Sequence, residues 1–114
     1  MENLTSASRL AICCIRCDLI AKKDRERIEK EMAALGTRLG RAVDLTVVEI
    51  DPTVAGPWMT IANALGRTHA TDVIVPDLAH VEGIEAIVRE RAQLITLAGE
   101  RILQRIHLRA GALA

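Results

Sequence analysis

Four short apolar runs alternate with helix-like segments along this chain, and that alternation restricts its fold more than any other feature. The runs cover Leu10 to Ile15, Val43 to Ile50, Asp72 to Val75 and Gln93 to Leu97. Each has the length of a buried strand, and the second and third are rich in β-branched residues. Alternating strands and helices predict right-handed crossovers. We therefore expect one α/β domain with a mostly parallel four-stranded sheet and helices on both faces.

The segments between these runs have the spacing of amphipathic helices. The first apolar stripe consists of Ile28, Met32, Leu35 and Leu39. Asp18 or Asp24 can cap the start of this helix, and Gly36 or Gly40 can end it. Gly56-Pro57 begins a second helix, because a proline at the first helical position costs no hydrogen bond. A third helix carries Ile84, Ile87 and Val88.

The segment from Glu100 to Leu113 is predicted to be a C-terminal amphipathic helix that follows a core over residues 9–99. Its apolar face holds Ile102, Leu103, Ile106, Ala110 and Leu113, and its other face holds Arg101, Arg105 and Arg109. Two interpretations stay open: the helix packs on its own sheet, or it packs on a second copy of the chain. The second interpretation predicts a homodimer with Ile102, Leu103, Ile106 and Leu113 at the interface.

Composition narrows the class of protein. The chain has 114 residues, with 15 Lys plus Arg against 15 Asp plus Glu, so its formal net charge is zero. That balance argues against tight non-specific binding of nucleic acid or of anionic lipid. No apolar run approaches the roughly 20 residues of a membrane span, and Met1 to Arg9 is too polar for a signal peptide. We therefore expect a cytoplasmic protein whose three cysteines are reduced.

Ligands of parallel sheets bind beyond the carboxyl ends of the strands, so these loops are where chemistry is expected. They cover residues 16–24, 51–56, 76–83 and 98–100, and their candidate side chains are Arg16, Cys17, Asp51 and His80. Asp51, Asp77 and Glu82 could gather there, although acidic residues at strand ends are more often simple caps.

Cys14-Ile15-Arg16-Cys17 is a C-x-x-C between a strand and a helix, a context that favours a reactive dithiol. The alternative is that Cys13 and Cys14 point to opposite faces of the sheet as inert core residues, while Cys17 lies past the strand. Arg16 and the start of the helix would then favour a Cys17 thiolate. The histidines have no metal-site spacing and no glycine-rich phosphate motif occurs, so we expect no metal and no cofactor.

The stretches that resemble one known family are Arg9 to Asp18, Val48 to Leu65 and Thr71 to Gly83. Ile15-Arg16-Cys17 ends the first strand, Glu49 to Pro57 follows the second, and Pro76 to Gly83 follows the third. Together they resemble the catalytic domain of the serine recombinases, the resolvase and invertase family, over residues 9–99. The resemblance implies a resolvase-like fold with the flavodoxin-like strand order and a tendency to self-associate.

The active-site positions of that family are changed here. The family's nucleophilic serine corresponds to Cys17, and the arginine before it is displaced by one residue, to Arg16. The arginine expected before Pro57 is absent, and His80 stands where the first arginine of the third motif would be. Removing one such cation from a phosphoryl-transfer site costs on the order of 10³-fold in rate. The family also continues into a long helix and a DNA-reading domain, whereas this sequence ends at Ala114.

We therefore expect a catalytically degenerate, resolvase-like module that self-associates and binds a protein partner, linked to a DNA transaction or a mobile element. The alternative is an enzyme, which would use Cys17 as a thiolate nucleophile on DNA phosphate or the Cys14 and Cys17 pair as a redox dithiol. The first reading requires a covered apolar face, and the second requires an exposed Cys17 of low pKa.

Overall fold

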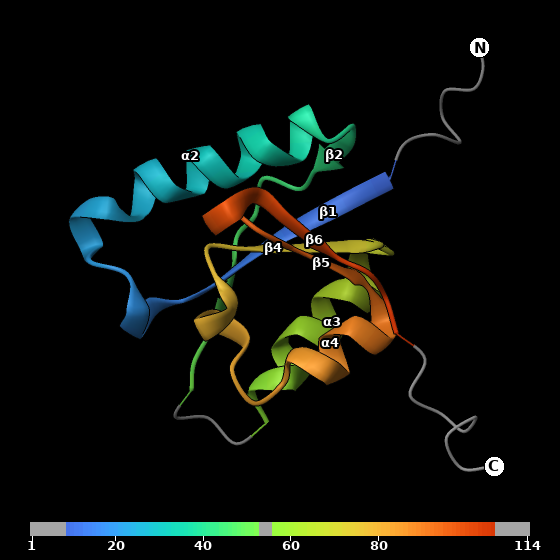
Figure 1. The fold of residues 1–114 in the computed structure, drawn as a ribbon. Coiled ribbons are helices and arrows are strands. Elements are labelled where there is room, and N and C mark those ends of the chain that lie inside the picture. Colours follow the sequence, from blue (N-terminus) through green and yellow to red (C-terminus); the bar gives the residue numbers. More distant parts are fainter. Residues whose placement is uncertain (1–8, 53–55, 107–114) are drawn as a thin grey trace, which may run out of the picture.

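A mixed sheet forms the centre of the molecule, with β1 (Arg9–Arg16) in its interior (Figure 1). The computed structural model describes residues 9–52 and 56–106. The other strands are β2 (Arg41–Val43), β3 (Val48–Ile50), β4 (Asp72–Val75), β5 (Gln93–Thr96) and β6 (Arg101–Leu103). Their order is β2-β1-β4-β5-β6, and β3 also pairs with β1. All pairs are parallel except β5 with β6, so the expected α/β domain with a mostly parallel sheet is confirmed. The expected number of four strands is wrong, because the described sheet has six.

Helices cover both faces of the sheet, as the alternation of elements predicts. α2 (Lys22–Arg38) lies on one face, and α3 (Pro57–Thr68) and α4 (Glu85–Arg91) lie on the other (Figure 1). Successive side chains of β1 point to opposite faces. Cys13 therefore belongs to the core under α2, and Cys14 belongs to the core under α3 and α4. Both cysteines are buried, as expected.

The ends of the helices agree with the sequence in part. Pro57 is the first residue of α3, as predicted. α2 begins after Ala21 with no side-chain cap, so neither of the expected aspartate caps is used. Gly40 follows the end of α2 at φ 81°, a left-handed conformation that suits glycine. Gly36 instead stays inside α2, where a Cβ would lie 2.6 Å from Val43 Cγ2.

The strand expected over residues 43–50 is interrupted. Val43 pairs with Ala11 in β1, and Val48 pairs with Cys14. Between these two pairs there are four residues on this side, Asp44–Val47, but only two residues in β1. The segment Asp44–Val47 is therefore a bulge. The N–H of Thr46 donates to Asp44 Oδ1 at 2.9 Å and closes the bulge on itself.

The C-terminal helix expected from Glu100 onward is wrong for the described residues. Gly99 and Glu100 have positive φ values of 73° and 47°, and they turn the chain back so that β6 pairs with β5. Ile102 and Leu103 therefore point to opposite faces of a strand rather than along one helical stripe. β5 would otherwise leave one edge unpaired. Backbone hydrogen bonds to that edge stabilise a strand here more than the helical spacing of the apolar residues stabilises a helix. Leu113 lies outside the described residues.

A buried ionic cluster joins the amino ends of three strands. The Asp72 carboxylate at the start of β4 is fully buried, and Arg9 of β1 and Arg41 of β2 lie 3.2 and 3.4 Å from it. Thr71 Oγ1 donates to the same carboxylate at 2.8 Å.

None of the helices in the described part of the chain is long and apolar enough to cross a membrane.

Candidate functional site

A pocket of about 340 Å³ lies at the carboxyl ends of β1 and β3. Arg16 and Ile50 are paired residues at the ends of these two strands, so the residues that follow them are neighbours. The pocket is lined by Cys17, Asp18, Glu49, Ile50, Asp51 and Pro52. This is the edge at which parallel sheets bind ligands, and two of the predicted site residues, Cys17 and Asp51, line the same pocket.

The Cys17 thiol is exposed and lies between two opposite charges. Its Sγ atom is 3.5 Å from Glu49 Oε1 and 3.8 Å from Arg25 Nη1. Arg25 is an α2 residue that also binds Glu49 through Nη2 at 2.5 Å and Glu29 through Nε at 2.6 Å. The guanidinium beside the thiol is thus bound by two carboxylates.

These surroundings raise the pKa of Cys17, contrary to the expected thiolate. Loss of hydration at the sulfur is the main cause, followed by the negative charge of Glu49 and the hydrogen bond to it, while Arg25 acts in the opposite direction. The Arg25 guanidinium also lowers the pKa of Glu49, so this carboxylate stays ionised beside the thiol. The neutral thiol is a poor nucleophile.

Contrary to expectation, the Arg16 guanidinium binds a carboxylate and not the Cys17 thiol. Its guanidinium makes two hydrogen bonds to Asp18, of 3.1 and 2.7 Å. The hydrogen bond raises the pKa of Arg16 and lowers that of Asp18, which keeps both charged. The positive charge that the sequence places next to Cys17 is therefore neutralised within the loop.

His80 does not line the pocket and instead makes a structural contact with the end of β1. The backbone N–H of Arg16 donates to His80 Nδ1 at 2.9 Å, which requires an unprotonated nitrogen there. The imidazole is almost fully buried, and this burial is the main reason that its pKa is lowered. A neutral His80 fixes the end of β1 and supplies no charge to a phosphate.

The remaining predicted features are separated from the pocket. Asp77 accepts a hydrogen bond from the N–H of Ala79 at 2.9 Å, which is the simple capping role foreseen for an acidic residue after a strand. Cys14 is fully buried under α3 and α4, and burial raises its pKa, whereas Cys17 lies beyond the strand end. A disulfide between them would require the core to open. Among the described residues, no three acidic, histidine or cysteine side chains gather closely enough to hold a metal ion.

Sequence reasoning missed Arg25 as a site residue. Its contact with Glu49 joins α2 to the end of β3, across 24 residues of sequence. The only local signal is the i, i+4 spacing of Arg25 and Glu29, which many exposed helix faces share. Glu49 itself belongs to the acidic segment that carries the family resemblance.

No protein-family model, no curated protein and no solved structure matches this chain.

Proposed function

We propose that this domain is a resolvase-like interaction module that does not cleave DNA and that associates with a second copy of itself. The resemblance to the serine recombinases favours a role in regulating a DNA transaction. The proposal has two parts, which are the loss of phosphoryl transfer at the carboxyl edge of the sheet and self-association at the β6 side of the sheet. Each part depends on its own observation.

The charge arrangement at the carboxyl edge supports the first part. Both arginines near Cys17 are engaged by carboxylates, Arg16 by Asp18 and Arg25 by Glu29 and Glu49. Phosphoryl transfer needs cations directed at the non-bridging oxygens. A site lined by carboxylates instead repels a phosphate and also suppresses the thiolate.

A plasmid-nicking and duplex-binding assay tests this part. We expect that the full chain neither nicks supercoiled DNA nor binds duplex tightly. Asp18→Asn combined with Glu49→Gln releases Arg16 and leaves Arg25 bound by Glu29 alone. This double variant should bind duplex about tenfold more tightly at roughly 50 mM salt. Glu26→Gln combined with Glu31→Gln is the matched control, because it makes the same change in net charge on exposed positions of α2.

Two results would contradict this part. If the control pair raises duplex affinity as much as the Asp18 and Glu49 pair, net charge alone governs binding. If the unmodified chain nicks DNA and Cys17→Ala abolishes the nicking, the domain is an enzyme with a thiol nucleophile.

The β6 side of the sheet supports the second part. β6 is the last strand in the order of the described sheet, so its outer edge carries backbone groups that no described strand pairs. Ile102 in the middle of β6 is 38% exposed. Antiparallel pairing of two β6 strands about a twofold axis would join two sheets and cover this isoleucine.

Sedimentation equilibrium tests this part. We expect a dimer at roughly 100 μM that Ile102→Glu dissociates, because the substitution places a charge in a dehydrated contact. Leu45→Glu is the matched control, since Leu45 is 87% exposed in the bulge between β2 and β3, away from β6. A strict monomer, or a dimer that only Leu45→Glu dissociates, would exclude the β6 interface.

A further inference from the structure

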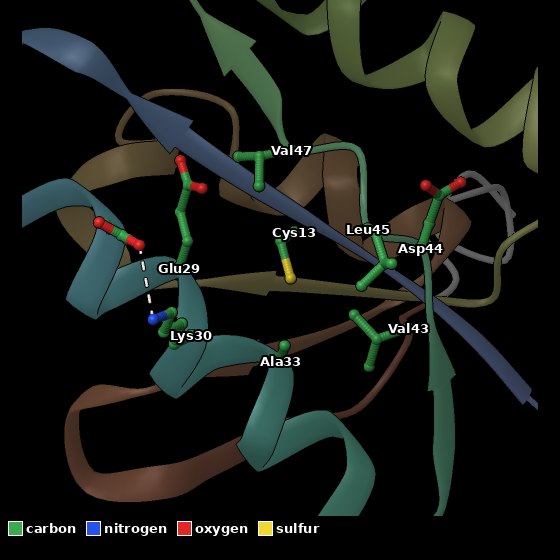
Figure 2. A pocket seen from close by; sticks show the side chains of 9 residues that line it. Cys13, Glu29, Lys30, Ala33, Val43, Asp44, Leu45 and Val47 are labelled. Carbon is green, nitrogen blue, oxygen red and sulfur yellow. Dashed lines mark ion pairs between the residues drawn. The ribbon is translucent and has the colours of Figure 1, made fainter.

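A second pocket, of about 210 Å³, lies between α2 and the bulge Asp44–Val47, away from the edge that holds Cys17 (Figure 2). It lies where the four residues Asp44–Val47 bulge outward opposite two residues of β1, Ile12 and Cys13, so that the pairing of an unbroken strand with β1 is interrupted. α2 presents a small residue at this place, Ala33, so the space is not filled from the helix side.

The interior of this pocket is apolar. Val43, Val47 and Ala33 form its walls, and Cys13 of β1 forms its floor with the sulfur directed into the space (Figure 2). Cys13 has a relative exposure of 2%, and no described residue hydrogen-bonds to its thiol. Burial, followed by the charges of Glu29 and Asp44, raises the pKa of Cys13 to about 12. This thiol therefore behaves as a small neutral apolar group.

The rim of the pocket has one negative charge that no described cation neutralises. Glu26 pairs with Lys30 at 3.4 Å, and Glu29 pairs with Arg25 at 2.6 Å. The Asp44 carboxylate instead accepts a hydrogen bond from the backbone N–H of Thr46. In Figure 2 this carboxylate points away from Cys13 and Ala33, on the outer side of the bulge, so a ligand must fill the apolar interior and also extend past the rim to place a positive charge beside Asp44.

We propose that this pocket binds a small ligand with an apolar body and a cationic end, of the alkylammonium or arylalkylammonium class. A cavity of about 150 Å³ holds a benzene ring, so this larger one accommodates a ring with a short arm. The apolar body contacts Cys13, Ala33 and Val43, and the ammonium group lies at Asp44. A ligand of about nine heavy atoms then has a dissociation constant on the order of 1 mM.

The experiment compares three probes of similar shape on the isotope-labelled full chain by NMR titration. They are 2-phenylethylammonium, the neutral 2-phenylethanol and the anionic 3-phenylpropionate. We expect amide shifts at Cys13, Ala33, Val43 and Val47, and an affinity for the cation about threefold higher than for the alcohol. Asp44→Asn should remove that preference while its remaining amide oxygen still accepts the bond from Thr46.

Ala33→Leu should abolish binding of all three probes, because the larger side chain fills the pocket. Ala34→Leu is the matched control, since Ala34 is the next residue of α2 and is exposed. If Ala33→Leu does not fold, the proposal is still tested by the amide shifts of the unsubstituted chain and by the Asp44→Asn titration. The proposal would be overturned if no probe binds at about 20 mM, or if the amide shifts are centred on the Cys17 pocket. It would also be overturned if Ala34→Leu loses probe binding as much as Ala33→Leu does, or if the anion binds most tightly.

Discussion

At the scale of single residues, the neutral state of His80 couples folding to pH. Its Nδ1 atom accepts the N–H of Arg16, and its burial lowers its pKa below the usual 6.5. The unfolded chain therefore binds a proton more readily than the folded chain as the pH falls. The stabilisation is complete above about pH 6.5 and is lost progressively as the pH falls toward the lowered pKa of the folded state.

Thermal or urea unfolding between about pH 7.5 and 5 should show this loss of stability. His80→Gln keeps a hydrogen-bond acceptor that does not titrate, so we expect the variant to lose most of the pH dependence in this range. His69→Asn is the control: His69 is exposed at the end of α3 with φ 60°, a conformation that asparagine tolerates. Asp18 and Glu49 have lowered pKa values and titrate below this window. A profile unchanged by His80→Gln would contradict the role given to the imidazole.

The three cysteines should differ in reactivity. Cys13 and Cys14 are buried on opposite faces of the sheet, and Cys17 is exposed. In the native protein we expect a maleimide to modify one thiol, at Cys17, because the raised pKa values of Cys13 and Cys14 keep these two thiols neutral and unreactive. All three should react after denaturation. Because the pKa of Cys17 is raised, the reaction at neutral pH should be slower than that of free cysteine. Mass spectrometry identifies the modified residue, and native labelling of a Cys17→Ser variant would contradict the assignment.

At the scale of elements, the packing of α2 on the sheet depends on a residue without a side chain. An added Cβ at Gly36 would lie 2.6 Å from Val43 Cγ2 and 2.9 Å from Ile74 Cδ1. We expect Gly36→Ala to lower the free energy of unfolding by about 1–3 kcal/mol, because overpacking outweighs the higher helix propensity of alanine. Gly66→Ala in α3 is the control, since nothing lies within 4 Å of its added Cβ. It should stabilise the protein by about 0.5–1 kcal/mol, and equal effects of both substitutions in urea unfolding would contradict this account.

The elements also show which parts of the fold are predictable from sequence. β1, β4 and β5 are buried on both faces, so their apolar runs predict them directly. The run from Val43 to Ile50 predicts one strand, because β-branched composition does not show that Asp44–Val47 bulges out. The spacing of Ile102, Leu103 and Ile106 predicts a helix where the structure has β6, because the reversal at Gly99 depends on the neighbouring edge of β5.

For the candidate site, the sequence predicts the positions of the residues but not their partners. The rule that strand ends form sites predicts the positions of Arg16, Cys17, Asp51 and His80 at one edge of the sheet. The sequence does not show which partner each charge chooses. Arg16 pairs with Asp18 two residues away, and Glu49 receives a cation from a helix far along the chain. These two pairings determine whether Cys17 is a thiolate, and its pKa is raised where the local sequence suggests that it is lowered.

At the scale of the whole molecule, Asp72 joins strands that come from separate parts of the sequence. Its carboxylate is fully buried, with Arg9 of β1 at 3.2 Å and the largely buried Arg41 of β2 at 3.4 Å. Arg41 also donates to Gln93 Oε1 at the start of β5, at 3.0 Å, so one cluster connects four strands at their amino ends. This edge lies opposite the one that holds the candidate site, and its Asp72 carboxylate is enclosed rather than offered to a ligand.

Removal of the Asp72 carboxylate should therefore destabilise the entire fold without altering the site. Asp72→Ala leaves Arg41 buried without its counter-charge, and breaking a buried ion pair in this way costs about 3–5 kcal/mol. Asp18→Asn is the matched control, because it removes one carboxylate from an exposed arginine pair, where solvent screens the charges, and should leave the free energy of unfolding nearly unchanged. Urea unfolding followed by circular dichroism measures both. A loss in Asp72→Ala no larger than that in Asp18→Asn would show that the cluster does not hold the strands together, whereas a large loss with one cooperative transition identifies it as the contact on which the assembly of the sheet depends.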